Sequence, residues 1–217
     1  GSPALCGVGV AFYLLAATGK RLAELGIIPA DVARDAVTDC LDLVALGTVA
    51  DVAPLLGENR VLVQLGLNSL NGRTRDGRYT GPRRVGLQAL FAEANLAPGK
   101  VNSHTIGFVI GPRLNAAGRL GSARVGYDLL VSPTMESAWP LAEVLGELNR
   151  QRQDMTRQFV EQARAMLAAL ESESYLSFVA GEDFHPGVVG LVAGRLAEEL
   201  YRPAVVAEIG PDETRGS

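Results

Sequence analysis

The sequence predicts an α/β protein with a helix-rich first part, a long connector helix and the start of a smaller α/β domain. Three observations carry this prediction. Apolar segments with helical spacing fill the chain to about residue 133, and the longest periodic stretch runs from there to about residue 170. Two short apolar segments then flank a helical one, which is the pattern of a β-α-β unit. We therefore expect domains over residues 1–133 and 172–217, joined by a connector helix over 134–171.

Helices account for most of the first part. Residues 5–17 are apolar and rich in small side chains, which is typical of a helix packed closely against its neighbours. A second helix opens at Pro29 and becomes almost wholly apolar over residues 41–49, so it must lie in the interior. Two more helices are expected over residues 58–70 and 85–94, with a polar loop containing Gly and Pro over 73–82.

The connector helix is predicted from large apolar side chains that recur at helical spacing between Leu141 and Leu170. At a rise of 1.5 Å per residue it would be about 50 Å long, which is longer than a small domain is wide. A helix of this length usually bridges two bodies. Beyond it, strands are expected over residues 175–180 and 204–209, with a helix over 187–200 between them.

The charge of the chain is distributed unevenly. The 217 residues carry 20 Lys and Arg against 24 Asp and Glu, for a net charge of −4. Residues 60–124 alone carry nine Arg and one Lys against two acids, so this stretch is +8 and the remainder is −12. The codon preference of a GC-rich genome would explain the excess of Arg over Lys, but it explains the clustering less well. We therefore expect a polyanionic partner, which Arg can hold through two hydrogen bonds.

Composition excludes several classes of protein. With 47% hydrophobic residues the chain is neither disordered nor fibrous, and its longest apolar run, residues 43–50, is far too short to span a bilayer. Cys6 and Cys40 provide no disulfide framework and no Cys-based metal motif. We expect a cytoplasmic protein without a membrane partner. Its first three residues show neither an initiator Met nor a targeting signal, as expected of a fragment.

Asp51 is the candidate metal ligand. It ends the apolar run 43–50, and a carboxylate emerging from such a segment needs a cation, a metal or several donors, because burying it alone would cost several kcal/mol. A carboxylate near a helix C-terminus is also unfavourable on the dipole argument. Metal ligation would explain both features, but a role in capping the turn at residues 52–54 is equally compatible. Asp42, at the other end of the run, is expected at a solvated edge.

Two further segments have the residue types of phosphate sites. The motif GPRLNAAGR at residues 111–119 predicts a compact loop, in which Arg113 and Arg119 would hold a phosphate beside Asn115. An ordinary Gly-Pro surface loop is the alternative. The motif HPGVVG at residues 185–190 stands at the entry to a helix, where free N–H groups form an anion site. His185 would donate to a phosphate oxygen, assist proton transfer or serve as a structural cap.

Together these segments resemble the RecJ family of single-strand-specific exonucleases, in the Asp-His-His (DHH) phosphoesterase superfamily. Their order and spacing fit along almost the whole chain. Residues 5–12 also resemble the family's segment that follows the Asp-His-His motif. The resembling segments are residues 42–51 with 57–60, residues 111–119, and residues 185–190 with 202–204.

The resemblance implies that residues 1–133 are the C-terminal part of a DHH catalytic domain. Residues 172–217 would be the N-terminal part of a DHHA1-type substrate-binding domain. Of the family's metal motifs only the last has a counterpart here, Asp51, and the others would lie before Gly1. Residues 215–217 resemble the opening of the family's phosphate-binding loop. The 217-residue chain alone is therefore expected to be inactive.

The resemblance also implies a function and a ligand set. The family uses two divalent ions, Mn²⁺ or Mg²⁺, and removes nucleotides from the 5′ end of single-stranded DNA in repair and recombination. A phosphodiesterase acting on short RNA or cyclic dinucleotides, and a nucleic-acid-binding fragment without catalysis, are the alternatives. The residues that would carry the site are Asp51 as metal ligand, His185 as catalytic residue, and Arg113, Asn115, Arg119 and Ser217 as binders of DNA or its phosphate.

Overall fold

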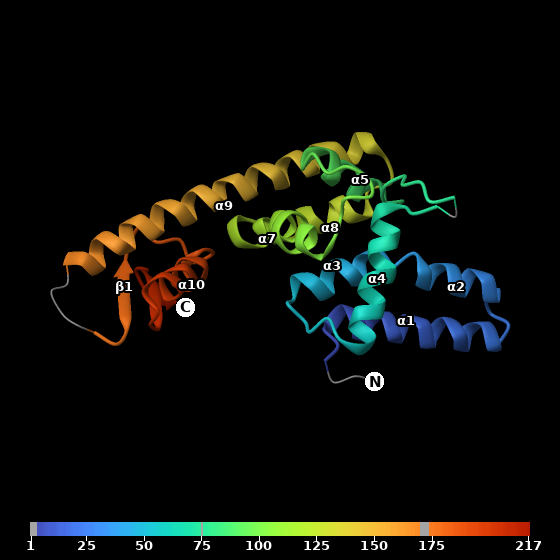
Figure 1. Ribbon diagram of the computed structural model, residues 1–217, viewed down its shortest axis with the longest axis horizontal. Coiled ribbons are helices and arrows are strands. Elements are labelled where there is room, and N and C mark those ends of the chain that lie inside the picture. Colours follow the sequence, from blue (N-terminus) through green and yellow to red (C-terminus); the bar gives the residue numbers. More distant parts are fainter. Residues whose placement is uncertain (1–3, 75, 170–173) are drawn as a thin grey trace. The chain divides into compact units, whose positions relative to one another are not determined.

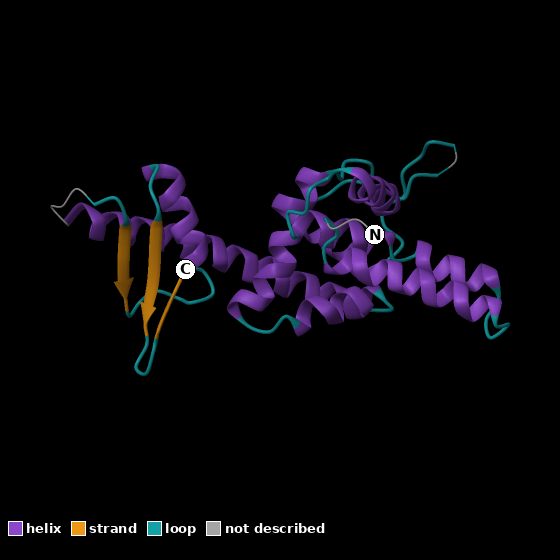
Figure 2. Cartoon of the chain, turned by 90° about the horizontal axis from the view of Figure 1, so that it is seen from below, coloured by secondary structure: helices purple, strands orange, loops and turns teal. Residues whose placement is uncertain are grey.

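The computed structural model describes residues 4–74, 76–169 and 174–217 and confirms the α/β class (Figures 1 and 2). The chain forms two compact units. Unit 1 contains residues 1–114 and 126–143, and unit 2 contains residues 115–125 and 144–217. Helices α7 (Gly111–Leu120) and α9 (Met135–Ala169) therefore each contribute residues to both units. The expected domain limit at residues 171–172 lies outside the described residues, and the limit at 133–134 stays a prediction.

Helices make up the chain as far as residue 131, in the order that Figure 1 labels. The helices expected near residues 5–17, 58–70 and 85–94 are confirmed. The elements are α1 (Gly7–Glu24), α2 (Ala30–Thr38), α3 (Leu41–Ala50), α4 (Gly57–Asn71), α5 (Val85–Glu93), the short α6 (Ser103–Thr105), the π-helix η1 (Ile106–Ile110), α7, and α8 (Arg124–Val131).

The helix expected to open at Pro29 and run into the apolar segment is interrupted. It forms α2 and α3, which are separated at Asp39 and Cys40. The guanidinium of Arg84 explains the break, because its Nη2 donates to the Asp39 carbonyl at 3.0 Å and so takes an acceptor of the helix end. The second helix begins again when the Val44 N–H donates to the Cys40 carbonyl at 3.0 Å.

Helix α3 is the core of unit 1, as its apolar sequence predicts. Val44, Ala45 and Leu46 on α3 are at most 5% exposed. Helix α4 crosses α3 so closely that a Cβ atom at Gly66 would overlap the Leu41 carbonyl and the Ala45 side chain. Backbone approach of this kind is possible only where a side chain is missing.

The polar segment between α4 and α5 is a loop, as expected, although residue 75 lies outside the described residues. Gly72 ends α4 with a positive φ of 61°. The Thr80 N–H donates to the Gly72 carbonyl at 3.2 Å, and a β-bridge joins Arg73 to Tyr79. These bonds close the segment into a narrow hairpin.

The long helix expected over residues 134–171 is found as α9, whose 35 residues span about 50 Å. Its role as a connector between domains stays a prediction. Its expected last residue, Leu170, lies outside the described residues. Pro140 lies inside the helix, within its first two turns. Among the helices that the structure describes, α9 included, we find none long and apolar enough to cross a membrane.

The β-α-β unit is confirmed in unit 2. Strands β1 (Ser177–Gly181) and β2 (Ala204–Ile209) are parallel and joined through α10 (Val189–Leu200), with Val179 opposite Val206. A third strand, β3 (Thr214–Gly216), pairs antiparallel with β2 and was not expected, because three residues without an apolar side chain give no strand signal. One core joins these strands to the helices: Phe159, Val160 and Ala163 of α9 pack with Phe184, Val188, Val192 and Leu196.

Replacing Gly66 with Ala tests the α3–α4 contact. We expect the free energy of unfolding to fall by about 1–3 kcal/mol, because the new methyl group enters a space already filled by the Leu41 carbonyl and Ala45. Thermal unfolding followed by circular dichroism measures the change. The control is Gly194→Ala, in the exposed middle of α10 with no atom within 4 Å of the added Cβ, which should stabilise slightly. Equal melting temperatures for both variants would contradict the prediction.

Candidate nucleic-acid and metal site

The six predicted site residues are divided between the two units. The candidate metal ligand Asp51 lies in unit 1, as does Arg113. The other four, Asn115, Arg119, His185 and Ser217, lie in unit 2.

Asp51 follows the last residue of α3 and is exposed to solvent. Its N–H donates to the Gly47 carbonyl at 2.9 Å, and the chain then turns at Val52, which has a positive φ of 55°. The expected cost of burying Asp51 therefore does not arise. Its carboxylate is accessible, and oxygen ligands of this kind suit Mg²⁺ and Mn²⁺. In the described ranges 4–74, 76–169 and 174–217, however, no three His, Cys, Asp or Glu side chains lie close enough to hold an ion together.

The buried carboxylate of this region is Asp42, and the expectation of a solvated edge was wrong. Asp42 is only 4% exposed, and its Oδ2 lies 3.2 Å from Nε of Arg84, whose side chain is itself mostly buried. Its Oδ1 accepts the N–H of Leu43 at 2.7 Å. Because Arg84 is 42 residues away in sequence, the local pattern of polar neighbours gave no sign of this partner.

The motif at residues 111–119 is a helix, and the expected loop was wrong. Gly111 has helical angles, φ −56° and ψ −47°, so the π-helix η1 continues directly into α7. Pro112 therefore lies inside a continuous helical run, just after the π-helical turn. The regular hydrogen-bond pattern is already interrupted at such a turn, so a residue without an N–H donor is tolerated there. Gly and Pro, which usually mark loops, here stand inside a helix.

Arg113 is engaged within unit 1. Its Nε lies 2.8 Å from Oε2 of Glu93 on α5, with side-chain exposures of 18% and 9%. Its Nη1 donates to the Val109 carbonyl at 3.0 Å. These bonds tie α7 to α5, and a partly buried ion pair of this kind is costly to break. The role of Arg113 in phosphate binding stays a prediction.

Arg119 connects α7 to the HPGVVG motif inside unit 2. Its Nη1 donates to the Gly187 carbonyl at 3.1 Å, and the residue is exposed. The backbones also meet there, because a Cβ at Gly187 would overlap the Arg119 carbonyl. Asn115 lies one helical turn earlier on α7 and is exposed. The sequence motifs 111–119 and 185–190 are therefore brought into contact.

His185 is held by its own loop. Its Nδ1 accepts the N–H of Gly187 at 3.0 Å, and its carbonyl accepts the N–H of Val188 at 3.0 Å. With Nδ1 as acceptor, the geometry assigns the proton of the neutral ring to Nε2. His185 is thus a structural cap of this turn that keeps one N–H donor.

Ser217 is brought to the start of α10 by β3. Its N–H and its carbonyl both bond Val206 of β2 at 3.0 Å, which extends the antiparallel pairing. A Cβ at Gly190, in the first turn of α10, would lie 3.0 Å from Ser217 Oγ. Hydroxyl and helix N-terminus are therefore neighbours, an arrangement that attracts anions.

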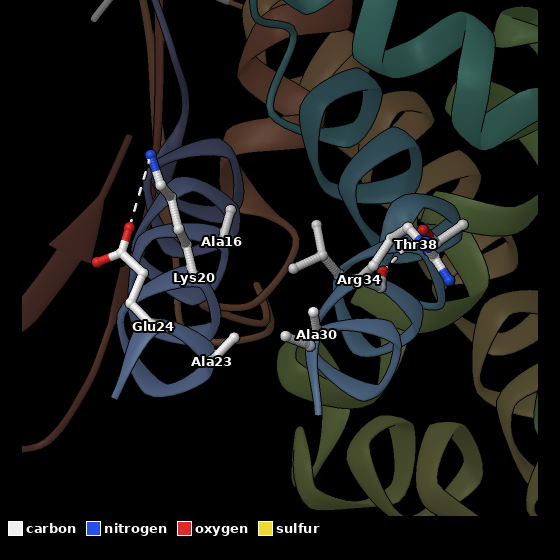
Figure 3. A pocket seen from close by; sticks show the side chains of 9 residues that line it. Ala16, Lys20, Ala23, Glu24, Ala30, Arg34 and Thr38 are labelled. Carbon is white, nitrogen blue, oxygen red and sulfur yellow. Dashed lines mark hydrogen bonds and ion pairs between the residues drawn. The ribbon is translucent and has the colours of Figure 1, made fainter. Parts of the chain in front are cut away.

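A groove of about 550 Å³ lies between α1 and α2 in unit 1 (Figure 3). Alanines at positions 16, 23, 30 and 33 line much of it, together with Lys20 and Arg34. The six predicted site residues are not among those that line it. Its wall is largely apolar.

No protein-family model matches the chain. It is 38% identical over 208 residues to the single-stranded-DNA-specific exonuclease RecJ of Haemophilus influenzae, which covers 94% of the chain and 35% of that relative. A crystal structure of RecJ from Thermus thermophilus in complex with Mg²⁺ matches with a TM-score of 0.76 at 33% identity, over 94% of the chain and 29% of that structure. The chain matches one part of RecJ.

Further RecJ relatives agree. RecJ of Bacillus subtilis is 38% identical over 212 residues, covering 98% of the chain and 24% of that relative. RecJ of Thermus thermophilus in complex with Mn²⁺ matches with a TM-score of 0.75 at 32% identity, over 95% of the chain and 29% of that structure. The chain spans about a third of the length of the Haemophilus relative. The resemblance to RecJ is confirmed, and Mg²⁺ and Mn²⁺ are the ions in these RecJ structures.

Substitutions of Arg113 and Arg119 distinguish a structural role from a binding role on the same helix. Arg113→Met should lower the free energy of unfolding by about 2 kcal/mol, because Glu93 loses a partly buried ionic partner. Arg119→Gln, on the same helix but exposed, should change stability little and weaken binding of single-stranded DNA. Urea unfolding and fluorescence anisotropy with a labelled oligonucleotide measure the two effects. An Arg113→Met protein of wild-type stability would show that the pair with Glu93 contributes nothing.

Proposed function

We propose that the chain is part of a metal-dependent exonuclease that digests single-stranded DNA from its 5′ end, and that it contributes a metal ligand and a phosphate-binding surface. The similarity to RecJ relatives named as single-stranded-DNA-specific exonucleases supports the substrate class. The single observation that carries the proposal is the bond from Arg119 to Gly187, which places a guanidinium beside the loop that opens α10.

Unit 2 would hold a phosphate group of the strand. The remaining N–H groups of the exposed Arg119 suit phosphate oxygens, and Nε2 of His185, whose ring is bonded to the same Gly187, would add a further donor. Ser217 Oγ and the first turn of α10 supply a hydroxyl and the positive end of a helix dipole. Asn115 would contribute its exposed amide. Arg113 would have to bind while keeping its bonds to Glu93 and Val109.

Asp51 would contribute one ligand to the metal site. Its exposed carboxylate fits a hard divalent cation, but the described residues gather no complete ligand set around it. We infer that the other ligands come from outside this group of residues. When bound, the ions of such a site supply a deprotonated water and neutralise charge on the scissile phosphate. The part of Asp51 is to offer an oxygen at the end of a rigid, buried helix.

For the 217-residue chain by itself, binding of single-stranded DNA without hydrolysis is the second candidate function. The resemblance places the remaining metal motifs before Gly1, which favours it. A phosphodiesterase of short RNA or cyclic dinucleotides would share this metal chemistry but prefer much shorter substrates.

We also propose a cytoplasmic location, because Cys6 and Cys40 are both free thiols.

Replacing Asp51 tests the metal role. In a full-length protein that carries this segment, Asp51→Ala should reduce Mn²⁺-dependent digestion of a single strand by at least about a hundredfold, because a lost ligand weakens the ion that activates water. Release of labelled nucleotides measures the rate. Asp35→Asn, an exposed carboxylate on α2, is the matched control and should retain activity. Full activity of Asp51→Ala would refute metal ligation, and preference for dinucleotides over long strands would support the phosphodiesterase instead.

The isolated chain should bind single strands without cutting them. We expect no turnover with added Mn²⁺ and an affinity that falls steeply with salt, with a slope of about 0.7 for each phosphate contact. Anisotropy over a series of salt concentrations and a gel assay for digestion measure the two properties. A flat salt response would show that the arginines of residues 60–124 do not contact nucleic acid, and clean turnover would show that the chain holds a working metal site.

A further inference from the structure

Three arginines on three different helices of unit 2 are near enough to interact electrostatically. Arg119 lies on α7, Arg152 on α9 and Arg195 on α10. Burial, and after it the positive charges of Arg119 and Arg195, lowers the pKa of the Arg152 guanidinium below its ordinary value. Like charges so close together raise the energy of the protein unless an anion joins them.

The Nε of Arg152 is buried and has no hydrogen-bond partner among the described residues. Its Nη2 donates to Oδ1 of Asn149, one turn earlier on α9, at 3.1 Å. That bond fixes the guanidinium plane and leaves the Nε donor unused. An unsatisfied buried donor is costly, and here it is part of a charge that no carboxylate compensates. Because Arg152 as a whole is half-buried, an anion would reach its guanidinium through the less enclosed nitrogens.

Acidic side chains do not neutralise the positive charges of this cluster, which consists of Arg119, Arg152 and Arg195. Within the part of the chain that the structure describes, no ion pair joins a carboxylate to Arg119, Arg152 or Arg195. Other arginines of the same unit do have such partners: Arg164 lies 2.7 Å from Glu199, and Arg157 lies 3.5 Å from Asp154. The cluster is thus an exception to the pattern of its own surroundings.

We propose that Arg152 and Arg195 join Arg119 to bind one phosphate group of the single strand. The inference rests on the proposed function and extends it to two arginines that the sequence motifs do not contain. A tetrahedral phosphate presents several oxygens and can accept from three guanidinium groups at once. Because Arg119 is also bonded to the Gly187 carbonyl, this phosphate would lie beside the HPGVVG loop.

Binding by the 217-residue chain tests the proposal. Arg152→Gln and Arg195→Gln should each weaken binding of a single-stranded oligonucleotide about tenfold, the effect of losing one charge-assisted hydrogen bond. Each should also lower the slope of the salt dependence by about 0.7. Arg152→Lys keeps the charge but replaces the planar guanidinium, which can hold a phosphate through two hydrogen bonds, with a single ammonium, so it should recover only part of the affinity. Arg157→Gln, an exposed arginine on the same helix, is the matched control and should bind as the wild type does.

Oligonucleotides with and without a 5′-phosphate identify which phosphate is bound. A loss confined to the phosphorylated strand assigns the terminal group, and an equal loss assigns an internal phosphodiester. Either result supports the site. Binding that is unchanged in both Arg152→Gln and the exposed Arg195→Gln would overturn the inference and leave the proposed function standing on Arg119.

Inorganic phosphate provides a readout that does not depend on DNA. Phosphate should raise the melting temperature of the wild type and Arg157→Gln above that in chloride of equal ionic strength, and it should do so less for Arg152→Gln and Arg195→Gln. Equal phosphate effects in all four proteins would overturn the inference. Stabilisation that depends on Arg152 in a chain that binds no oligonucleotide would refute the proposed function while keeping the phosphate site.

Discussion

The contact between α7 and the loop before α10 is the constraint on which the candidate site of unit 2 depends. Arg119 donates to the Gly187 carbonyl, and the Arg119 carbonyl occupies the space that any side chain at position 187 would need. Only Gly allows two backbones to approach in this way. His185 is then oriented by the N–H of the same glycine. The backbone of Gly187 therefore orients both the guanidinium of Arg119 and the imidazole of His185.

Periodicity was enough to predict the main elements of the fold. The long helix α9 and the β-α-β order follow from apolar spacing, and β2 begins and ends where the sequence suggests. The motif at residues 111–119 misled because Gly and Pro are usually loop residues, whereas here they lie inside a helix, just after the π-helical turn. Strand β3 could not be predicted, since it depends on pairing with β2 and not on its own residues.

The candidate site was less predictable than the fold, because its electrostatics depend on distant partners. Asp42 and Arg84 are 42 residues apart, and Arg113 and Glu93 are 20 apart, so neither pair leaves a local signal. Asp51 was expected to be buried, with a bound metal offsetting the cost of burying its charge. The apolar helix ends before this residue, however, and its carboxylate is exposed to solvent. The energetic reason given for choosing this residue was therefore wrong, and its role as a metal ligand stays a prediction.

The π-helix η1 has a consequence for how this chain can change. A π-helical turn contains one residue more than an α-helical turn, so a single deletion within Ile106–Ile110 would restore regular α-helix at little local cost. Because the wide turn takes up its extra residue without a net rotation, everything after the deletion would keep nearly its present direction. Arg113 would still face Glu93, and the tie between α7 and α5 would be kept. A deletion in the regular helix α7 before Arg113 would instead turn the following residues by about 100°. The π-helix is therefore the place in this run where the chain can lose a residue without redirecting the arginines that follow.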